Sequence, residues 1–460
     1  MSGATSFDCC ATPLTKGVTL LEASAGTGKT YALARVFLRL VAEEGVEVGK
    51  ILTVTFTSTA TEELRDRIRS LLVEALQILR EKEEEGEDPA IRRLRTLKEV
   101  PVEECMSRIK LAITCFDEST ISTIHGFCNH VLTENSFETQ SLFDAELDKE
   151  ADKLSTEAVQ EYWRERFASA EPFVSAAAST KKIKPEAMAK FFNKLPSTQE
   201  YELGFAQAVG FETAQSVLVE GFDSLKNAWA LGRAEYGDYV ASCLGKRAKA
   251  KTQLGKHSKV LDRMLAEGGD VSAAGIEILE VMQACELKAL KEHQALEKPL
   301  FAREAESFWA ALESFARAVR VDCVSYLKEK VARWKRDRGL LSFDDLLSLT
   351  AKAVTGKDRA GESLRKGLRD SFEAALIDEF QDTDPVQFEI FRELFGNTKE
   401  HWLYLIGDPK QSIYRFRGAD LEAYFDFSAK TEAAKYSLDT NYRTVTSLVQ
   451  AVNSFFSNAD

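Results

Sequence analysis

The chain has 460 residues, of which 44% are hydrophobic and 29% are charged. This composition supports a packed core and argues against global disorder, and the length fits two or three domains or one large domain with an insertion. Lys and Arg total 60 against 73 Asp and Glu, so the formal net charge of −13 excludes a uniformly basic nucleic-acid coat, although a local basic groove stays compatible with it.

The N-terminal segment alternates predicted strands and helices. Val18–Ala23 and Ile51–Phe56 have the composition of buried strands. Apolar residues at helical spacing follow each strand: Leu33, Phe37 and Leu40 after the first, and Leu64, Ile68, Leu71, Ala75 and Leu79 after the second. This alternation predicts a parallel sheet flanked by helices, and the acidic run at 81–88 predicts a solvated linker or helix end.

A phosphate-binding loop is predicted where the first strand ends. The sequence ASAGTGKT has the Walker A spacing, with Ala in place of the first Gly, and its residues are Ala23, Ser24, Ala25, Gly26, Thr27, Gly28, Lys29 and Thr30. Backbone N–H groups of such a loop converge on a phosphate, Lys29 would reach the β- and γ-phosphates of ATP, and the Thr30 hydroxyl would ligate Mg²⁺. The alternative is a Gly-rich turn that only joins strand to helix.

The middle of the chain differs in character from both ends. Between Ala145 and Gly339 strand-like runs vanish, and Ala, Leu, Glu and Lys dominate at helical spacing. The α/β pattern resumes with Ala374–Ile377 and Leu403–Ile406, and Asp384 is a predicted N-cap before Pro385. We therefore expect one α/β domain formed by residues 1–145 and 340–460 and interrupted by a helical insertion at 146–339.

Two carboxylates follow the strand at Ala374–Ile377, in the sequence LIDEFQDTD. Asp378 occupies the position of a Walker B residue that holds Mg²⁺, and Glu379 would orient and deprotonate the attacking water. In isolation these two acids are equally compatible with a helix N-terminal cluster. Together with the Walker A loop they indicate an ATP-hydrolysing site.

Seven motifs occur in a fixed order between residues 20 and 444. They are ASAGTGKT, VTFTSTATEELRDRIR (54–69), TIHGFC (123–128), SFDDLL (342–347), IDEFQDTD, IGDPKQSIYRFRGAD (406–420) and LDTNYRT (438–444). This series resembles the superfamily 1 helicases of the UvrD/Rep type, and most closely their RecB/AddA branch. The resemblance implies a RecA-like P-loop domain with a large all-helical insertion.

The resemblance also implies further site residues. Thr55, Thr57 and His125 would contact single-stranded DNA, and Gln411 would sense the γ-phosphate. Phe416 would stack on a base and Arg417 would link that contact to the nucleotide, with Tyr414 beside them; the alternative is that the two aromatic residues belong to the core. Tyr442 would stack on adenine and Arg443 would contact the γ-phosphate. The glutamine that reads adenine in many relatives has no counterpart, because the first glutamine is Gln77.

Other patterns are less specific. Cys115, His125, Cys128 and His130 do not have zinc-site spacing. The basic stretches at 246–263 and 328–338 fit either a phosphate-contacting face or a solvated helix surface. No apolar run reaches the ~18 residues of a membrane helix, no signal peptide is visible, and eight scattered cysteines form no disulfide framework. We expect a cytoplasmic protein that does not contact a membrane.

The expected function is the ATPase core of a 3′→5′ DNA helicase from a RecBCD- or AddAB-like recombination and repair system. Its expected partners are single-stranded DNA or a duplex end with a 3′ tail, and RecC/RecD- or AddB-like subunits or a chain that supplies a second motor domain. Motifs of that domain and of a nuclease module do not follow Thr444 in this sequence, so we expect ATP and DNA binding but poor movement by this chain alone. The alternatives are a half-motor that binds without turnover and, less compatibly, a nucleotide kinase.

Overall fold

The computed structural model divides into two compact units, the first formed by residues 1–145 and 342–460 and the second by residues 146–341. The structure describes residues 5–81, 88–139, 146–147, 151–180, 183–193, 195, 209–244, 258–265, 271–273, 275–278, 298–414 and 419–457.

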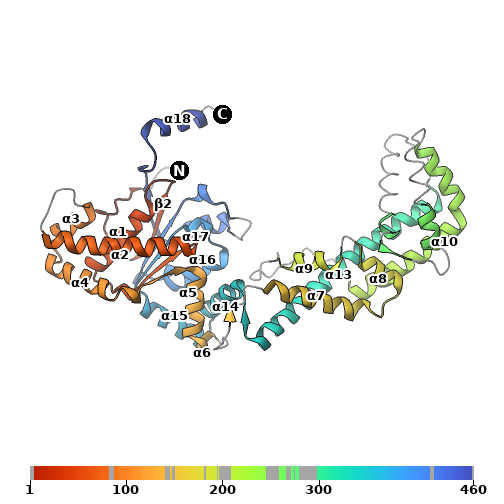
Figure 1. The fold of residues 1–460 in the computed structure, drawn as a ribbon, viewed down its shortest axis with the longest axis horizontal. Coiled ribbons are helices and arrows are strands. Elements are labelled where there is room, and N and C mark those ends of the chain that lie inside the picture. Colours follow the sequence, from red (N-terminus) through yellow and green to blue (C-terminus); the bar gives the residue numbers. More distant parts are fainter. Residues whose placement is uncertain are drawn as a thin grey trace. The chain divides into compact units, whose positions relative to one another are not determined.

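A seven-stranded parallel sheet forms the centre of the first unit (Figure 1). Its strand order is β1-β9-β2-β8-β7-β3-β4. The strands are β1 (Thr5–Ser6), β2 (Gly17–Ala23), β3 (Ile51–Thr55), β4 (Thr120–Thr123), β7 (Ala374–Ile377), β8 (Trp402–Gly407) and β9 (Ala433–Leu438). Because β2 lies between β8 and β9, the chain returns to its first sheet after the second unit. The predicted α/β class is confirmed.

The central strands of this sheet are buried on both faces, as is usual for parallel strands covered by helices. Every residue of β7 and β8 is buried. Alternate residues face one helix group: Ala374 and Leu376 share a core cluster with α1–α4, whereas the equally buried Ala375 and Ile377 lie outside it. These strands therefore read as continuous apolar runs in the sequence.

Helices of the first unit form two packed groups. The first contains α1 (Lys29–Ala42), α2 (Ser58–Glu81), α3 (Pro89–Thr96) and α4 (Val102–Thr114). The second contains α5 (Ile124–Glu134), α6 (Ser136–Thr139), α14 (Phe343–Thr355), α15 (Arg359–Ser371) and α16 (Pro385–Phe391). The remaining elements are the short turns η1 (Val48–Lys50), η2 (Phe116–Glu118), η3 (Phe380–Asp382), η4 (Arg392–Gly396) and η5 (Pro409–Gln411), with helices α17 (Leu421–Lys430) and α18 (Thr446–Ser457).

Most local predictions for this unit are confirmed. The apolar residues predicted to share a face of α1 and of α2 are all buried. Asp384 caps α16 by accepting hydrogen bonds from the backbone N–H groups of Val386 and Gln387. The sequence did not predict β1, β4 and β9. The last two have polar or only partly buried residues instead of an apolar run.

The second unit has its own hydrophobic core, built by long helices. Helix α10 (Phe211–Leu244) packs against α13 (Leu300–Arg338), and α13 also packs against α7 (Ala151–Phe167), α8 (Pro172–Ala178) and α9 (Pro185–Phe192). Residues 258–265 and 275–278 are also helical. Two short strands that the sequence did not predict, β5 (Glu146–Leu147) and β6 (Leu340–Leu341), pair in parallel. Within the described residues of the whole chain, no helix combines the length and apolar character needed to cross a membrane.

Candidate functional site

The predicted site residues follow the carboxyl ends of neighbouring parallel strands. The phosphate loop follows β2, Asp378 follows β7, Gln411 lies just after β8, and Tyr442 follows β9. Since all these strands are parallel, their carboxyl ends share one edge of the sheet, which is where open α/β sheets bind ligands. The fold therefore collects side chains that are more than 400 positions apart in sequence.

The phosphate loop has the backbone of an open, glycine-dependent turn. Gly26 and Gly28 both have positive φ, 80° and 85°, in the region that glycine adopts without strain. Ala23 is the last residue of β2, and the Thr27 hydroxyl donates to Ser24 O at 2.8 Å, which closes the loop on itself. Lys29 and Thr30 are the first two residues of α1, so this helix begins where a phosphate would lie.

Lys29 forms an ion pair with the acidic segment after β7. Its Nζ donates to Glu379 Oε2 at 2.6 Å, and the two side chains are 13% and 36% exposed. The two residues are 350 positions apart in sequence. The Walker A lysine and the second carboxylate of the Walker B segment thus meet directly.

The acidic segment carries more negative charge than Lys29 can neutralise. Burial and the Glu379 carboxylate raise the pKa of Asp378 from 3.8 to about 6, and the same causes raise the pKa of Asp382 to about 6. Asp382 Oδ1 is buried and has no hydrogen-bond partner among the described residues. Three crowded carboxylates beside one ammonium group are a donor set suited to a divalent cation.

Glu379 also has an unusual backbone. Its φ of 51° and ψ of 42° place it in the left-handed region, and it is the one non-glycine residue with positive φ in the described part of the chain. Such a conformation costs roughly 1 kcal/mol or more and concentrates at functional sites. The turn directs Glu379 towards Lys29 while Asp378 N still donates to Val54 O in the neighbouring strand.

Gln381 connects the acidic segment to the segment after β8. Its side chain is buried; Nε2 donates to Glu379 Oε2 at 2.8 Å, and Oε1 accepts from the Asp408 backbone N–H at 2.8 Å. Asp408 Oδ2 in turn accepts from Gln411 Nε2 at 2.6 Å. A continuous hydrogen-bonded path therefore runs from Lys29 through Glu379, Gln381 and Asp408 to Gln411. We call it the edge network.

The segment after β9 touches the phosphate loop through its backbone. Tyr442 N donates to Gly26 O at 2.8 Å, and Asn441 Nδ2 donates to Ala25 O at 3.3 Å. A Cβ on Gly26 would lie only 2.8 Å from Arg443 Cβ, so this contact requires glycine. The side chain of Tyr442 is 78% exposed, and that of Arg443 is also exposed.

Three of the residues expected at DNA lie at the same edge of the sheet. Thr57 is exposed and its hydroxyl accepts from Ala60 N at the start of α2. Thr55, in contrast, is buried, and its hydroxyl bonds to Thr57 O and Thr61 Oγ1. The structure therefore places Thr55 behind the loop that presents Thr57. Thr55 pairs in register with Thr123, which precedes α5 and its half-buried residue His125.

Aromatic contacts surround this region. His125 packs edge-on against Phe343, with ring centroids 5.3 Å apart, and burial lowers the pKa of His125 below its ordinary value. Tyr414 stacks obliquely on Phe56 with centroids 4.6 Å apart, which joins the segments after β8 and β3. Phe416 and Arg417 lie outside the described residues.

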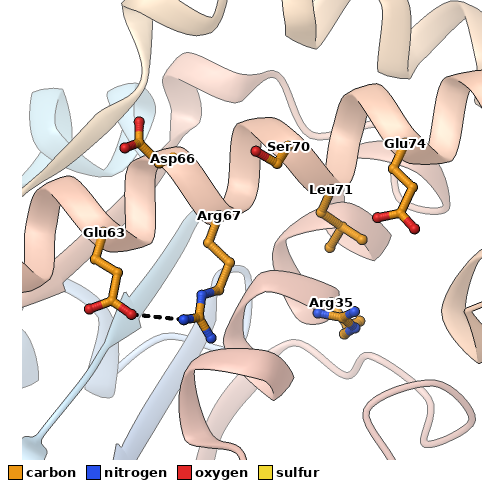
Figure 2. Close-up of a pocket in the computed structure, with 7 residues that line it drawn as sticks. All are labelled: Arg35, Glu63, Asp66, Arg67, Ser70, Leu71 and Glu74. Atoms are coloured by element: carbon orange, nitrogen blue, oxygen red, sulfur yellow. Dashed lines mark hydrogen bonds and ion pairs between the residues drawn. The ribbon is translucent and has the colours of Figure 1, made fainter.

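A polar pocket between α1 and α2 is separate from the phosphate loop (Figure 2). It has a volume of about 410 Å³ and is lined by Arg35, Glu63, Asp66, Arg67, Ser70, Leu71 and Glu74. Glu63 and Arg67 pair with each other at 2.7 Å. No phosphate-loop residue lines it, and its three carboxylates exceed its two arginines, which disfavours a triphosphate.

The described part of the two basic stretches is partly paired. In α13, Lys330 forms an ion pair with Glu161 at 2.5 Å, and Arg338 approaches Glu157 at 3.7 Å. Residues 246–257 of the other stretch lie outside the described residues. These pairs favour a solvated helix surface for the end of α13.

Gln381, Phe56 and Phe343 are site residues that sequence reasoning did not single out. Each lies inside a motif that was recognised, but its partner belongs to another motif: Asp408, Tyr414 and His125, respectively. For Gln381 and Phe56, the signal that could have found them is their position just after β7 and β3, whose carboxyl ends the sheet order brings together; Phe343, at the start of α14, has no such signal. Tyr31 was missed as well; a Cβ built on Gly28 would contact both Tyr31 and Tyr442, so both side chains lie against this part of the phosphate loop.

An all-parallel sheet with a phosphate loop and a buried acidic segment at its carboxyl edge defines a P-loop α/β protein. The model of the UvrD/REP helicase N-terminal domain matches residues 8–432, and the chain belongs to this family of helicases.

Curated relatives include the RecBCD enzyme subunit RecB of several bacteria. The chain is 32% identical to RecB of Escherichia coli K12 over 97% of its own length and 38% of that protein. It is 29% identical to RecB of Haemophilus influenzae, over 95% of the chain and 40% of the relative, and 26% identical to RecB of Mycobacterium tuberculosis, over 96% and 30%. The chain therefore spans less than half the length of these relatives.

Proposed function

We propose that this chain binds and hydrolyses ATP as the motor core of a 3′→5′ DNA helicase in a RecB-like system of recombination and repair. In this proposal the first unit is the RecA-like motor domain and the second unit is its helical insertion. The edge network carries the proposal, because it joins the phosphate-loop lysine to the acidic segment and to Gln411 in one hydrogen-bonded path. A turn without function would not need a continuous path of this kind, centred on the buried Gln381.

In the proposed site, the backbone of residues 23–28 and the start of α1 receive the phosphates of ATP. Lys29 exchanges its contact with Glu379 for the β- and γ-phosphates, which releases the Glu379 carboxylate to accept a proton from water. Gln411 and Arg443 face the γ-phosphate, and Tyr31 and Tyr442 flank the loop beside the base. Nucleotide binding would thus break the Lys29–Glu379 ion pair and leave the Glu379 carboxylate free to act as the general base.

Mg²⁺ fits the carboxylate-rich segment described above. We propose Asp378 and the Thr30 hydroxyl as its protein ligands, and the ion would neutralise charge on the β- and γ-phosphate oxygens. The raised pKa of Asp378 and the unpartnered Asp382 Oδ1 support a bound cation, because both carboxylates are desolvated beside Glu379.

DNA is proposed to cross the edge of the sheet at β3, β4 and β8. Thr57 and the start of α2 would contact phosphates, while Thr55 holds the Thr57 loop in place. His125 and Tyr414 would face the strand, and we retain Phe416 and Arg417 as proposed contacts. Since neutral and aromatic groups dominate here, binding would not depend on base identity.

A partner supplying a second motor domain, or RecC/RecD- or AddB-like subunits, is proposed to cover α18. This helix exposes apolar side chains that a protein surface normally buries; Val452, Phe455 and Phe456 are 46%, 74% and 69% exposed. The exposure of Tyr442 also favours the second candidate function, an ATP-dependent binding module without turnover.

Single-stranded-DNA-stimulated ATP hydrolysis tests the proposal. Lys29→Ala should abolish nucleotide binding, and Glu379→Gln should bind ATP but reduce turnover by about 10²-fold or more. The matched controls are Lys50→Ala and Glu373→Gln, since these residues form an exposed ion pair at the opposite ends of β3 and β7. If the control substitutions reduce ATP hydrolysis as much as Lys29→Ala and Glu379→Gln do, the assignment of Lys29 and Glu379 to the ATP site is refuted. A wild-type chain that binds ATP without hydrolysing it would favour the binding module.

DNA contact is tested separately by fluorescence anisotropy with a labelled single-stranded oligonucleotide. His125→Ala and Tyr414→Ala should each weaken binding by about 1 kcal/mol or more, whereas His130→Ala, on the exposed face of the same helix as His125, should not. Equal affinities for His125→Ala and His130→Ala would remove His125 from the proposed DNA path.

A further inference from the structure

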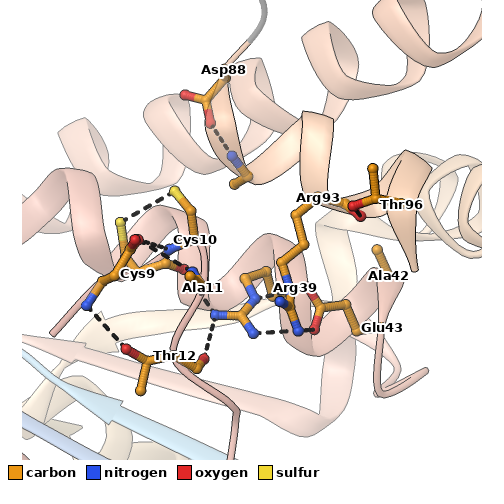
Figure 3. Close-up of polar contacts among 12 residues, drawn as sticks. Cys9, Cys10, Ala11, Thr12, Arg39, Ala42, Glu43, Asp88, Arg93 and Thr96 are labelled. Carbon is orange, nitrogen blue, oxygen red and sulfur yellow. Dashed lines mark hydrogen bonds and ion pairs between the residues drawn. The ribbon is translucent and has the colours of Figure 1, made fainter. Parts of the chain in front are cut away.

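Two adjacent cysteines, Cys9 and Cys10, lie in the loop between β1 and β2 (Figure 3), and the carboxylate of Asp8 is close to both. Cys9 Sγ and Cys10 Sγ are 3.7 Å apart, and the ligand atoms of Asp8, Cys9 and Cys10 all lie within 4.8 Å of one another. Within the described ranges, this is the one group of three His, Cys, Asp or Glu side chains close enough to share a cation. None of these residues belongs to the edge network.

A local turn brings the two sulfurs to the same side of the chain. Asp8 Oδ1 accepts from the backbone N–H groups of Cys10 at 2.8 Å and Ala11 at 3.2 Å, while Asp8 O accepts from Thr12 N. In an extended chain, consecutive side chains point to opposite faces. The turn overcomes that separation and also fixes the carboxylate beside the thiols.

The separation of the sulfurs matches a tetrahedral metal site. With Zn–S bonds of about 2.3 Å, tetrahedral geometry places two thiolates about 3.8 Å apart. The observed 3.7 Å therefore requires almost no rearrangement on binding. A carboxylate oxygen is a common third ligand of zinc, and water can complete the set.

The backbone of this loop is hydrogen bonded to a buried side chain of helix α1. The guanidinium of the fully buried Arg39 donates to Cys9 O at 3.0 Å and to Thr12 O at 2.8 Å, and it pairs with Glu43, which also binds Arg93 (Figure 3). Arg39 belongs to α1, the helix that begins at Lys29. A cation would thus enter a loop that is already ordered, which reduces the entropic cost of binding.

Access to the cluster is open on one side. Asp8 is exposed and Cys10 is half-buried, while Cys9 is buried against the core. We propose that Asp8, Cys9 and Cys10 form a binding site for a thiophilic divalent cation of the zinc class, with two thiolates, one carboxylate and one solvent position. Occupancy would further stabilise the turn formed by residues 8–12. This proposal is independent of the proposed ATPase function.

The test uses the full chain, reduced and stripped of metal by a chelator. Titration with Cd²⁺ should give a near-ultraviolet thiolate-to-metal charge-transfer band that saturates at one equivalent, and a large excess of Zn²⁺ should reduce this band by competing for the same site. Cys10→Ser should halve the band and weaken binding by about 100-fold or more, and Asp8→Asn should weaken binding by about 10-fold while leaving the band. Cys115→Ser, at another half-buried free cysteine, is the matched control and should change neither.

Thermal melting provides the second measurement. Zn²⁺ should raise the melting temperature of the wild-type chain and of Cys115→Ser, but not of Cys10→Ser. Both tested ligand positions are accessible to solvent, so the result does not depend on whether Cys9→Ser folds. Absence of the band in the wild-type chain, its persistence at full intensity and unchanged affinity in Cys10→Ser, or its loss in Cys115→Ser would each refute the site and leave a simple thiol contact.

Discussion

Replacement of Asp378 by Asn is predicted to stabilise the protein at neutral pH in the absence of a divalent cation. Asp378 follows β7, and its backbone N–H remains hydrogen bonded to Val54 O. Its Oδ1 accepts from Glu379 N at 2.9 Å, a bond that an asparagine oxygen preserves. The substitution therefore removes a charge without removing the hydrogen bond.

The expected magnitude follows from the pKa of Asp378, which burial and Glu379 raise from 3.8 to about 6. At 1.36 kcal/mol per pKa unit this shift corresponds to about 3 kcal/mol, and solvent access to the partly buried carboxylate reduces our expectation to about 2 kcal/mol. Because the folded-state pKa is raised, the stabilising contribution of the protonated form is complete below about pH 4 and is lost as the pH rises through about 6. Asp378→Asn should thus match the wild type near pH 4 and exceed it above pH 6.

Amide hydrogen exchange in β7 and β8 is the suitable assay, since it reports the unit that contains Asp378. The control is Asp370→Asn, an exposed position in α15 that makes the same change in charge. Added Mg²⁺ and nucleotide should protect the wild type but not Asp378→Asn. Equal protection of the β7 and β8 amides from exchange in Asp378→Asn and Asp370→Asn, near pH 8 without a divalent cation, would refute the reasoning from a buried charge.

Three further substitutions, one of them with a matched control, test polar contacts and packing within the first unit. Gln381→Ala should lower the free energy of unfolding by about 2–4 kcal/mol, because it leaves the buried Asp408 N–H without an acceptor and opens a void. Full DNA-stimulated ATP hydrolysis by this variant would contradict the role of Gln381 in connecting the two segments. Gly407→Ala would place Cβ 2.6 Å from Gln381 Oε1, and this clash should lower the free energy of unfolding by about 1–3 kcal/mol. The control Gly367→Ala places its Cβ in open space on α15 and should raise the free energy of unfolding by about 0.5–1 kcal/mol. Similar rates of amide hydrogen exchange in the two variants would exclude the clash. Glu43→Ala should cost about 3 kcal/mol by removing the counter-ion of a fully buried guanidinium, and urea unfolding within about 0.5 kcal/mol of wild type would contradict this.

The sequence predicted the strands that are buried on both faces. Ala374–Ile377 matches β7 residue for residue, and β2, β3 and β8 differ from prediction by one residue at one or both ends. Such strands can be predicted from an apolar run that is bounded by turn residues. This criterion does not find β4, whose sequence TIST is mostly polar, or β9, whose residues are only partly buried.

The contacts within the edge network could not be predicted in the same way. Gln381 and Asp408 are 27 residues apart, and their hydrogen bond depends on β7 and β8 being neighbours in register. The left-handed backbone of Glu379 leaves no signal either, because glutamate has no preference for that region. Motif order indicated which residues belong to the site, but sheet order determines which of them touch.

The two lysine–glutamate pairs at opposite ends of the sheet show why the edge network matters more than a single ion pair. Lys50 and Glu373 meet at 3.0 Å beside the amino ends of β3 and β7, with side chains 37% and 41% exposed. Lys29 and Glu379 meet at 2.6 Å at the carboxyl edge, where two further carboxylates have raised pKa values and Gln381 extends the contact to Asp408. An exposed pair of the first kind is screened by solvent and contributes little to stability. The second pair concentrates negative charge that only an additional cation can neutralise, and this excess charge is the property that favours a magnesium–nucleotide site at the carboxyl edge.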